Sequence, residues 1–426
     1  MTLAGRTGLT GRHGAVGIFV HHRRPVGVTV RARGFETRTV YETFKNSRRV
    51  GIRIYRPQLQ WPLYGVIATR TQAQTHIRLR PPFRTVWSLD MGGLIEFPAV
   101  VQSGVAYIGN STGTIRAISM RFGRVIWRHD TFAHAASSPA VWGRDVVYHT
   151  MSDGRVHVLD RGTGRERWSF DVASPIESSP VVRHGIDYFG AWNGRLYALD
   201  LRTHRLRWSR ELGAKMTGSA TISGHTLYIG DYAGRVWALW PGSGATRWVR
   251  SVNGRVYGTV AASAGRLFVP SSTGNSLTAF STAGSELWRV GTGGYVYSSP
   301  AVWHGVVAFG SYDGHLYGVS ASSGRLLWRA WAGGPISGAA VVVDGIAYAG
   351  SFRHRIIGVS ASTGRTVLTF DHGEYVPVSG NGMRLLFHGY SRLYAVEPKP
   401  VSKHRHRRAV TRSHSTHTRH LRRKGS

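Results

Sequence analysis

The 426-residue chain has no cysteine and few acidic residues, with 21 Asp and Glu against 55 Lys and Arg. The acidic residues form no cluster in the sequence, whereas a calcium ion takes about six to eight oxygen ligands, several of them usually carboxylates. A Gly-rich phosphate loop, a nucleophile elbow and the residue spacings of a zinc site are also missing. We therefore expect no catalytic residue, no metal site and no cofactor.

Long apolar runs are missing as well. No stretch approaches the roughly 18 apolar residues of a membrane-spanning helix, and the apolar segment at residues 14–22 is too short for a signal-peptide core. Without cysteine, no disulfide pattern indicates an oxidising compartment. The residues alone therefore fit a cytoplasmic protein and equally an exported one whose anchor precedes the given start.

The positive charge is concentrated toward the two ends of the chain. Residues 1–86 hold 16 basic and 2 acidic residues, and residues 399–426 hold 10 basic and no acidic ones. The segment 398–426 has almost no apolar residue to bury, so we expect a disordered tail. Both ends are candidates for contact with a polyanion, such as nucleic acid, anionic lipid or an anionic envelope polymer. A tail that only aids solubility is the alternative.

The tail also contains five histidines with H-x-H and H-x-x-H spacings, at His404, His406, His414, His417 and His420. Such spacings bind transition metals weakly. A mobile tail offers no supporting shell of hydrogen bonds, so we expect no dedicated metal site there.

What the sequence does contain is a repeat of about 40 residues. One ladder of large apolar residues recurs with spacings of 40 or 41, at Trp87, Trp127, Trp168, Trp208, Trp248, Trp288, Trp328 and Leu368. A second ladder of alternating apolar segments runs in phase with it and begins at Ile115, Val156, Leu196, Val236, Leu277, Leu316, Ile356 and Leu393. A period near 40 with strand-like content is the signature of a β-propeller with one four-stranded blade per repeat.

The ends of the repeat array predict how the ring closes. The copy at Trp87 is a fourth strand without the three strands that should precede it, and the copy at Leu393 lacks a fourth strand. We therefore expect an all-β protein, an eight-bladed propeller of four-stranded blades over residues 84–397, closed by N- and C-terminal strands in one blade. A seven-bladed ring with a stray repeat is the alternative.

The repeats resemble a known family. Val158–Trp168 (VLDRGTGRERW) and Val319–Trp328 (VSASSGRLLW) are similar to the tryptophan-docking motif of pyrroloquinoline-quinone-like (PQQ-like) propeller repeats. The chain departs from that motif at His204, where Gly is usual, and at Leu368, where Trp is usual. The resemblance implies one of two branches. One consists of quinone-dependent dehydrogenases, and the other of non-catalytic scaffolds such as the propeller lipoprotein of the outer-membrane barrel-assembly machine.

The resemblance to the dehydrogenases implies PQQ held over calcium, a catalytic Asp and often two adjacent cysteines. This chain has no cysteine, and Asp160, Asp200 and Asp231 stand singly at repeat positions. We therefore expect a non-catalytic binding or scaffold protein with a protein partner or a small ligand. A PQQ-dependent oxidoreductase is the first alternative, and a polyanion or nucleic-acid binder is the second.

The N-terminal part divides near residue 60. Residues 1–60 are Arg-rich, with Val26–Val30 as the one strand-like piece, and we expect a basic, disordered arm without a fold. Residues 61–83 resemble a leader segment of bacterial, actinobacterial-type relatives, and the matching positions are Trp61, Tyr64, Gly65, Arg70, Pro81, Pro82, Phe83 and Arg84. We expect an extended strap packed on the propeller, with a plain linker as the alternative. Since such relatives are typically exported, the resemblance implies a location at the cell envelope.

Propeller geometry predicts where a binding site would lie. The loops that join the fourth strand of one blade to the first strand of the next surround the mouth of the central channel. Residues seven and nine positions after each ladder residue fall in these loops, and residues two apart on a strand share a face. The resulting ring combines two acids, basic residues and tyrosines, and its candidate binding residues are Glu96, His134, Glu177, Lys215, Arg255, Tyr257, Tyr295, Tyr297 and Tyr375. Ordinary loop variability is the alternative explanation.

Overall fold

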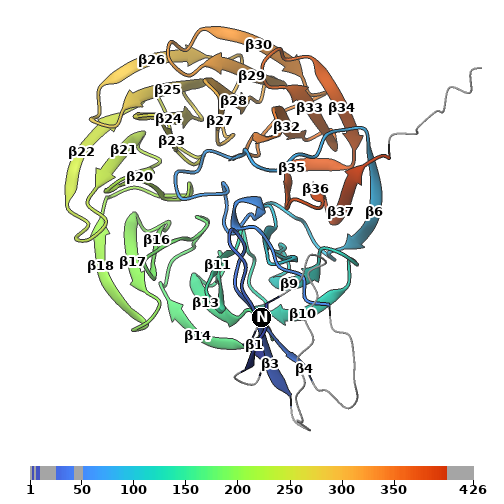
Figure 1. Cartoon of the computed structure of the whole chain (residues 1–426). Coiled ribbons are helices and arrows are strands. Elements are labelled where there is room, and N and C mark those ends of the chain that lie inside the picture. Colours follow the sequence, from blue (N-terminus) through green and yellow to red (C-terminus); the bar gives the residue numbers. More distant parts are fainter. Residues whose placement is uncertain (1, 4–5, 10–24, 43–50, 401–426) are drawn as a thin grey trace, which may run out of the picture.

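Eight β-sheets arranged around a central axis make up most of the protein (Figure 1). The computed structural model describes residues 2–3, 6–9, 25–42 and 51–400, so the predicted tail beyond residue 400 lies outside the described residues. The four strands of each blade pair antiparallel, and in blades 1 to 7 they follow chain order from the inside of the ring outward. The eight-bladed, four-stranded propeller predicted from the repeat is confirmed.

The first strand of each blade lies nearest the axis and the fourth forms the outer edge; the first strand has three residues in blades 1 to 7 and eight in blade 8. Blades 1 to 4 consist of β7 (Val100–Gln102), β8 (Val105–Gly109), β9 (Thr114–Ser119), β10 (Val125–Asp130); β11 (Ala140–Trp142), β12 (Asp145–His149), β13 (Arg155–Asp160), β14 (Glu166–Asp171); β15 (Val181–Arg183), β16 (Ile186–Gly190), β17 (Arg195–Asp200), β18 (Arg205–Glu211); and β19 (Thr221–Ser223), β20 (Thr226–Gly230), β21 (Arg235–Leu239), β22 (Thr246–Ser251). Blades 5 to 8 consist of β23 (Ala261–Ser263), β24 (Arg266–Ser271), β25 (Ser276–Ser281), β26 (Glu286–Gly291); β27 (Ala301–Trp303), β28 (Val306–Gly310), β29 (His315–Ser320), β30 (Leu326–Trp331); β31 (Val341–Val343), β32 (Ile346–Ser351), β33 (Arg355–Ser360), β34 (Thr366–Asp371); and β35 (Gly373–Gly380), β36 (Leu385–Gly389), β37 (Arg392–Pro398) with β6 (Phe83–Asp90).

Blade 8 closes the ring by combining the two ends of the repeat array. Its outer strand β6 comes from the start of the array and pairs antiparallel with β37 from its end, with Trp87 opposite Ala395. The closure predicted from the two incomplete repeats is therefore confirmed. It leaves the ring without a free edge between its first and last blades.

The tryptophan ladder holds neighbouring blades together. The Trp127 indole in blade 1 covers Gly164, in the last turn of blade 2, and its Nε1 donates to the Arg161 carbonyl at 2.9 Å. A Cβ on Gly164 would lie 2.5 Å from this ring, and the φ of Gly164 is +73°. Both the close contact and the positive φ therefore require glycine here. In blade 3 the turn carries His204 instead, and the Trp168 indole stacks on its imidazole at 4.4 Å.

The same contact explains the ladder position without tryptophan. Each ladder tryptophan packs on the turn between the third and fourth strands of the following blade. Leu368 belongs to blade 7, and the following blade 8 has no such turn because the two chain ends meet there. A docking tryptophan at residue 368 would therefore lack its partner.

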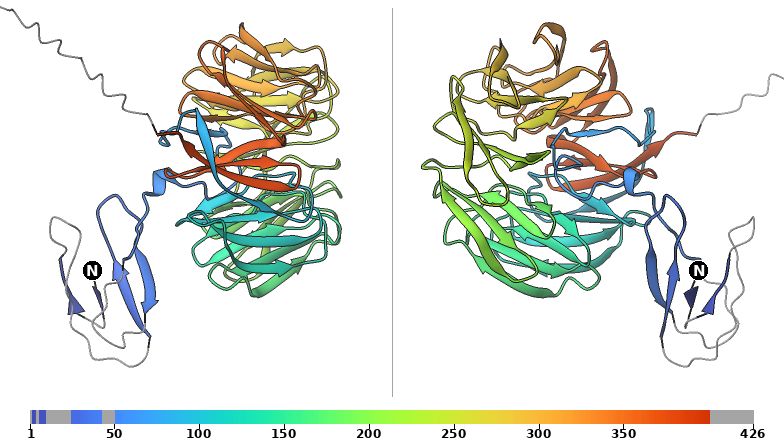
Figure 2. Two further views of the ribbon diagram at one scale, coloured as in Figure 1. Left: turned by 90° about the vertical axis from the view of Figure 1, so that its right-hand side faces the viewer. Right: turned by 60° about the vertical axis from the view of Figure 1, so that its left-hand side comes forward.

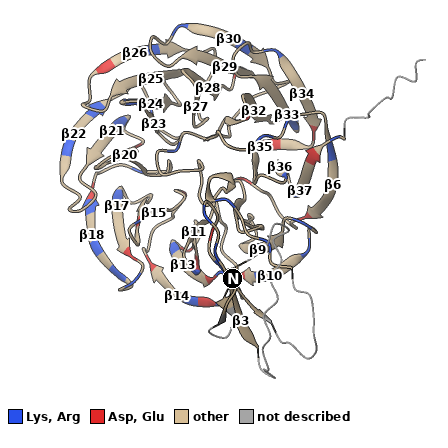
Figure 3. Ribbon diagram, viewed as in Figure 1, with Lys and Arg blue, Asp and Glu red and all other residues tan. Residues whose placement is uncertain are grey.

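The N-terminal arm differs from the expectation of no fold. Its described part contains β1 (Thr2–Leu3), β2 (Arg6–Thr7), β3 (Val26–Val30) and β4 (Arg38–Glu42), which form one sheet in the order β2-β1-β3-β4, and η1 (Pro57–Leu59) follows. This sheet stands beside the propeller disc (Figure 2). The sequence indicated β3, which carries no charged residue (Figure 3). Its partners have two residues each in β1 and β2 or are polar in β4, so hydrophobic periodicity does not show them. The described residues contain no helix long and apolar enough to cross a bilayer.

Candidate functional site

The strap runs through the central channel and closes it at the level of the first strands. Backbone carbonyls of the strap accept hydrogen bonds from first strands around the ring. In each pair the backbone N–H of a first-strand residue donates to a strap carbonyl: Val141 to Pro62, Ile222 to Ala68, Ala262 to Thr69, Val302 to Thr71 and Val342 to Gln72. The short strand β5 (Ala73–Gln74) also adds a parallel fifth strand to blade 7. Residues 61–74 thus form the base of a channel that would otherwise be open.

Arg70 anchors the strap. Its side chain is fully buried, and its guanidinium donates to the carbonyls of Ala220 at 3.0 Å, Ser179 at 3.1 Å and Pro180 at 3.0 Å, and to that of Tyr64. The Tyr64 ring is also buried, and its hydroxyl lies 3.1 Å from Oγ of Ser299 in the loop before blade 6. Arginine suits this place because its planar fork satisfies several carbonyls at once.

Above the strap lies a cavity of about 430 Å³, which we call the cup. The cup is lined by Tyr64 and Phe97 and by small residues of the inner loops, such as Ser219, Thr259 and Ser299. The loops that enter first strands surround it. Seven of the nine predicted binding residues line the cup, namely Glu96, His134, Glu177, Lys215, Tyr257, Tyr297 and Tyr375.

The other two predicted residues border the cup without lining it. The Arg255 guanidinium lies 5.7 Å from the centroid of the Tyr232 ring. Tyr295 is 46% exposed and packs edge-on against Tyr297, with their ring centroids 5.9 Å apart. Geometry thus brings the predicted ring together, and whether it binds a partner stays a prediction.

One side of the cup is a continuous series of aromatic rings, which we call the aromatic arc. It runs from blade 4 to blade 8 through Tyr232, Tyr257, Tyr297, Tyr312, Phe352 and Tyr375, with neighbouring ring centroids 4.9–6.2 Å apart. Aromatic rings at these separations stabilise one another beyond their buried area. The arc therefore presents a firm apolar wall.

The other side carries charge. Glu177 accepts from the Tyr257 hydroxyl at 2.5 Å and from Nε1 of Trp192 at 3.2 Å. The Lys215 ammonium lies 3.1 Å from the centroid of the Trp192 ring and 4.9 Å from that of Tyr232. It thus occupies an aromatic box of the protein's own making.

Burial shifts the acid–base properties of this side. Burial raises the pKa of Glu96, and the nearby His134, whose Nε2 lies 3.4 Å from Oε2 of Glu96, opposes that rise. Burial lowers the pKa of Lys215, with Glu177 opposing the fall. Burial and the neighbouring Glu177 both raise the pKa of Tyr257.

Sequence reasoning missed half of the aromatic wall. Four aromatics of the cup lie in loops between second and third strands, one or two residues after the second strand ends, namely Trp192, Tyr232, Tyr312 and Phe352. These loops share a face of the disc with the loops that enter first strands, because successive strands are antiparallel. The signal was present, since these aromatics also follow the 40-residue period.

The lining of the cup offers few ligand oxygens for the calcium ion that would hold a quinone. The lining includes two carboxylates, Glu96 and Glu177, and both oxygens of Glu177 already accept hydrogen bonds. Calcium takes about six to eight oxygens. Within the described ranges, the group of His and acidic residues whose ligand atoms converge within 4.8 Å is His129, His157 and Glu166, on third and fourth strands, and none of the three lines the cup.

Comparison with known proteins gives one family and many similar folds. A family model described as outer membrane protein assembly factor BamB matches residues 111–259 and 243–369, more than half of the chain. The structure of BamB from Moraxella catarrhalis aligns with a TM-score of 0.64 and 17% identity, over 76% of this chain and 100% of that one.

Enzymes share the fold too. Quinohemoprotein alcohol dehydrogenase from Comamonas testosteroni aligns with a TM-score of 0.66 and 15% identity, over 80% of this chain and 81% of that one. A europium-containing methanol dehydrogenase aligns with a TM-score of 0.70 and 12% identity, over 80% and 98%. At such identities the likeness shows the fold alone. No curated protein matches the sequence.

Proposed function

The chain belongs to the family described as outer membrane protein assembly factor BamB, and from that premise we propose that it is a non-catalytic scaffold whose cup binds a protein partner at the bacterial cell envelope. The observation that carries the proposal is the convergence of seven predicted residues, from seven different blades, on one cavity. Because the strap closes its base, a partner enters from the face that carries the aromatic arc.

The size and lining of the cup indicate what part of a partner it takes. A cavity of about 430 Å³ lies in the range of small-ligand sites, so it holds a few side chains rather than a folded domain. An exposed loop or peptide that inserts an apolar side chain would pack against the aromatic arc. A hydrogen-bond donor on the same loop would reach Glu96, whose side chain is about one-quarter exposed.

The family description points to the envelope, and the described residues leave the means of attachment open. We propose that the protein is attached there, through an upstream anchor or through its partner. Fractionation of cells that express the gene with its native upstream region tests this. Salt-resistant recovery with the envelope supports the proposal, and recovery in the soluble fraction contradicts it.

Quinone-dependent oxidation is the competing function, because two similar folds are quinoproteins or methanol dehydrogenases by name. The donor set of the cup argues against it, as does the absence of cysteine. Titration with pyrroloquinoline quinone and calcium, followed by visible absorbance, separates the two functions. Our proposal expects no saturable spectral change, and a stoichiometric change would replace the scaffold with an enzyme.

Partner binding is tested by recovery of the full-length tagged protein from envelope fractions. Tyr297→Ala removes an aromatic ring from the wall of the cup. At a buried aromatic contact this costs about 2 kcal/mol or more, roughly a 30-fold loss of affinity. Phe122→Ala is the matched control, since Phe122 is 59% exposed at a turn on the opposite face. A partner retained by the control and lost by Tyr297→Ala supports the proposal, and equal recovery contradicts it.

A further inference from the structure

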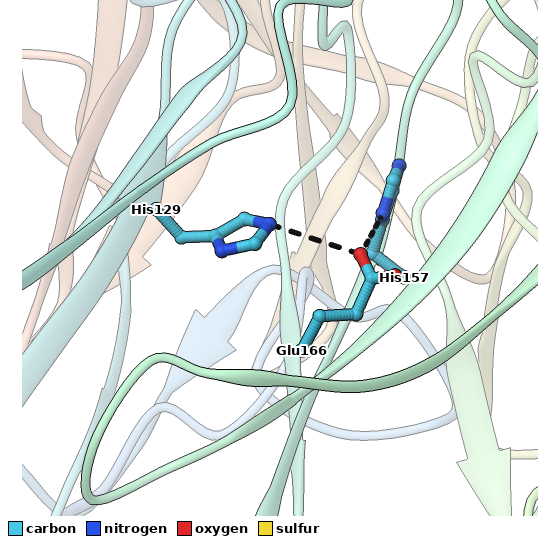
Figure 4. Close-up of side chains that lie close together, drawn as sticks. All are labelled: His129, His157 and Glu166. Atoms are coloured by element: carbon cyan, nitrogen blue, oxygen red, sulfur yellow. Dashed lines mark hydrogen bonds and ion pairs between the residues drawn. The ribbon is translucent and has the colours of Figure 1, made fainter.

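Two histidines and a glutamate from neighbouring blades converge at the junction of blades 1 and 2 (Figure 4). His129 lies on β10, the outer strand of blade 1, and His157 and Glu166 lie on β13 and β14 of blade 2. Nδ1 of His157 is 2.7 Å from Oε2 of Glu166, and Nε2 of His129 is 3.7 Å from the same oxygen. All three ligand atoms lie within 4.8 Å of one another.

An ion pair accounts for only part of this arrangement. His157 already gives Glu166 a hydrogen-bonded partner. The His129 contact at 3.7 Å is too long for a hydrogen bond, yet its Nε2 faces the same carboxylate oxygen. Tetrahedral zinc with bonds of about 2.0–2.2 Å places its ligand atoms about 3.3 Å apart. Small side-chain movements would bring the three atoms to that spacing.

A hydrogen bond to the second nitrogen of His157 orients its ring. Nε2 of His157, on the far side from Glu166, lies 3.3 Å from Oγ1 of Thr150, which in turn donates to Asp153 at 2.5 Å. Metal-binding histidines characteristically use their second nitrogen in this way, which fixes the tautomer that coordinates.

The other blade junctions show that the fold does not need these residues. The three equivalent positions hold mainly apolar side chains at several junctions, as in Phe170, Tyr197 and Leu206; Val290, Tyr317 and Leu326; and Phe370, Tyr394 and Thr85. At the last of these, Phe370 and Tyr394 pack with their centroids 5.2 Å apart, where His129 and His157 lie 6.5 Å apart. No other junction of the described propeller brings three metal ligands to these positions.

We propose that His129, His157 and Glu166 form a site for a divalent transition metal ion of the zinc class that clamps blade 1 to blade 2. Two imidazole nitrogens and one carboxylate oxygen are ligands that zinc accepts, with water at the fourth position. The side chains of His129 and Glu166 are 22% and 33% exposed, so an ion can reach them.

The test uses the full-length protein freed of metal by chelation, with cobalt(II) as a spectroscopic probe and zinc as its competitor. We expect one equivalent of cobalt per chain at this site, with the visible absorption of a low-coordinate cobalt ion, displaced by zinc. A variant with His129→Phe, His157→Tyr and Glu166→Leu, which carries the residues of the next junction, should bind one equivalent fewer. Equal binding by the two proteins would overturn the proposal.

Three further variants keep the result interpretable. Glu166→Gln preserves the shape of the site and should weaken cobalt binding even if the triple variant folds poorly. Replacing the five tail histidines with Ser removes the competing ligands of the tail. This variant should still bind one equivalent of cobalt at the propeller. Thr150→Val should weaken the affinity about 10- to 100-fold, as loss of a supporting hydrogen bond does. Loss of all cobalt binding from the tail variant would overturn the proposal.

Discussion

The hydroxyl of Tyr257 donates a 2.5 Å hydrogen bond to Oε1 of Glu177, which belongs to a loop two blades away. This bond ties the aromatic arc to the charged side of the cup. Neither loop contacts the other through its backbone strands, so the side chains themselves set the width of the cavity at this point. The cup is therefore a preorganised feature rather than a gap between loops.

Tyr257→Phe should destabilise the protein and loosen the cup. The substitution leaves a carboxylate oxygen of a buried glutamate without its donor, which costs about 1–3 kcal/mol. The midpoint of urea unfolding measures this cost. Tyr295→Phe is the matched control, because Tyr295 is 46% exposed, and it should change the midpoint little. Equal effects of the two substitutions would show that the Glu177 bond contributes nothing.

Arg70→Met should detach the strap from the inner loops. Four carbonyls lose a charged donor, and hydrogen bonds to charged groups contribute about 1.5–3 kcal/mol each. We expect a loss of about 3 kcal/mol or more and faster proteolysis within residues 61–74. Arg78→Met serves as the control, since Arg78 is largely exposed and makes a surface ion pair worth at most about 1 kcal/mol. A strap that stays protected in Arg70→Met would contradict this role.

Stability should fall between about pH 6.5 and pH 4 because of His388. Burial lowers the pKa of this histidine to about 4, and its Nε2 accepts a hydrogen bond from the Ala99 amide at 3.1 Å. Above pH 6.5 the ring is neutral in both states, so it has no effect. As the pH falls toward 4, His388 becomes protonated in the unfolded chain but stays neutral in the folded protein. This difference lowers the free energy of unfolding by about 3 kcal/mol in total.

Urea unfolding of the protein and of His388→Gln, measured across this pH range, isolates the histidine, because all other groups titrate in both proteins. The difference between the two curves should grow as the pH falls. Parallel curves would contradict the assignment.

Two substitutions in the tryptophan ladder should have unequal effects on stability. Trp328→Ala should cost about 3–5 kcal/mol, because the indole is buried against Gly364 and donates to the Ala361 carbonyl at 2.9 Å. Leu368→Trp should bring no gain in melting temperature, since blade 8 has no turn to receive the ring. A large stabilisation by Leu368→Trp would mean that the ladder residues act by size alone.

The propeller was predictable because its blades repeat in sequence and in space. Each ladder segment, such as Val156 and Val158, is buried at the same place in its blade, so the period reports the architecture directly. The closing pair β6 and β37 followed from counting incomplete repeats. The sheet of the arm was not predicted, because only β3 shows as a strand-like segment and its partners β1, β2 and β4 are too short or too polar for a pattern to indicate them.

The cup was predictable in part. Loop positions after each ladder residue are periodic, which brought Glu177 and Tyr257 onto one ring in the sequence. The path of the strap has no repeat, and a buried arginine such as Arg70 reads in sequence as one more surface charge. Its burial becomes evident only when carbonyls from two inner loops and from the strap itself surround the guanidinium.

The central claim is that the cup is the surface through which this protein binds its partner. Photo-cross-linking in cells tests it most directly, with a photoreactive phenylalanine analogue placed at Tyr297 in the cup or at Phe122 on the opposite face. We predict a discrete cross-linked product from position 297 that is absent from position 122. A product from position 122 alone, or the same product from both, would contradict the account.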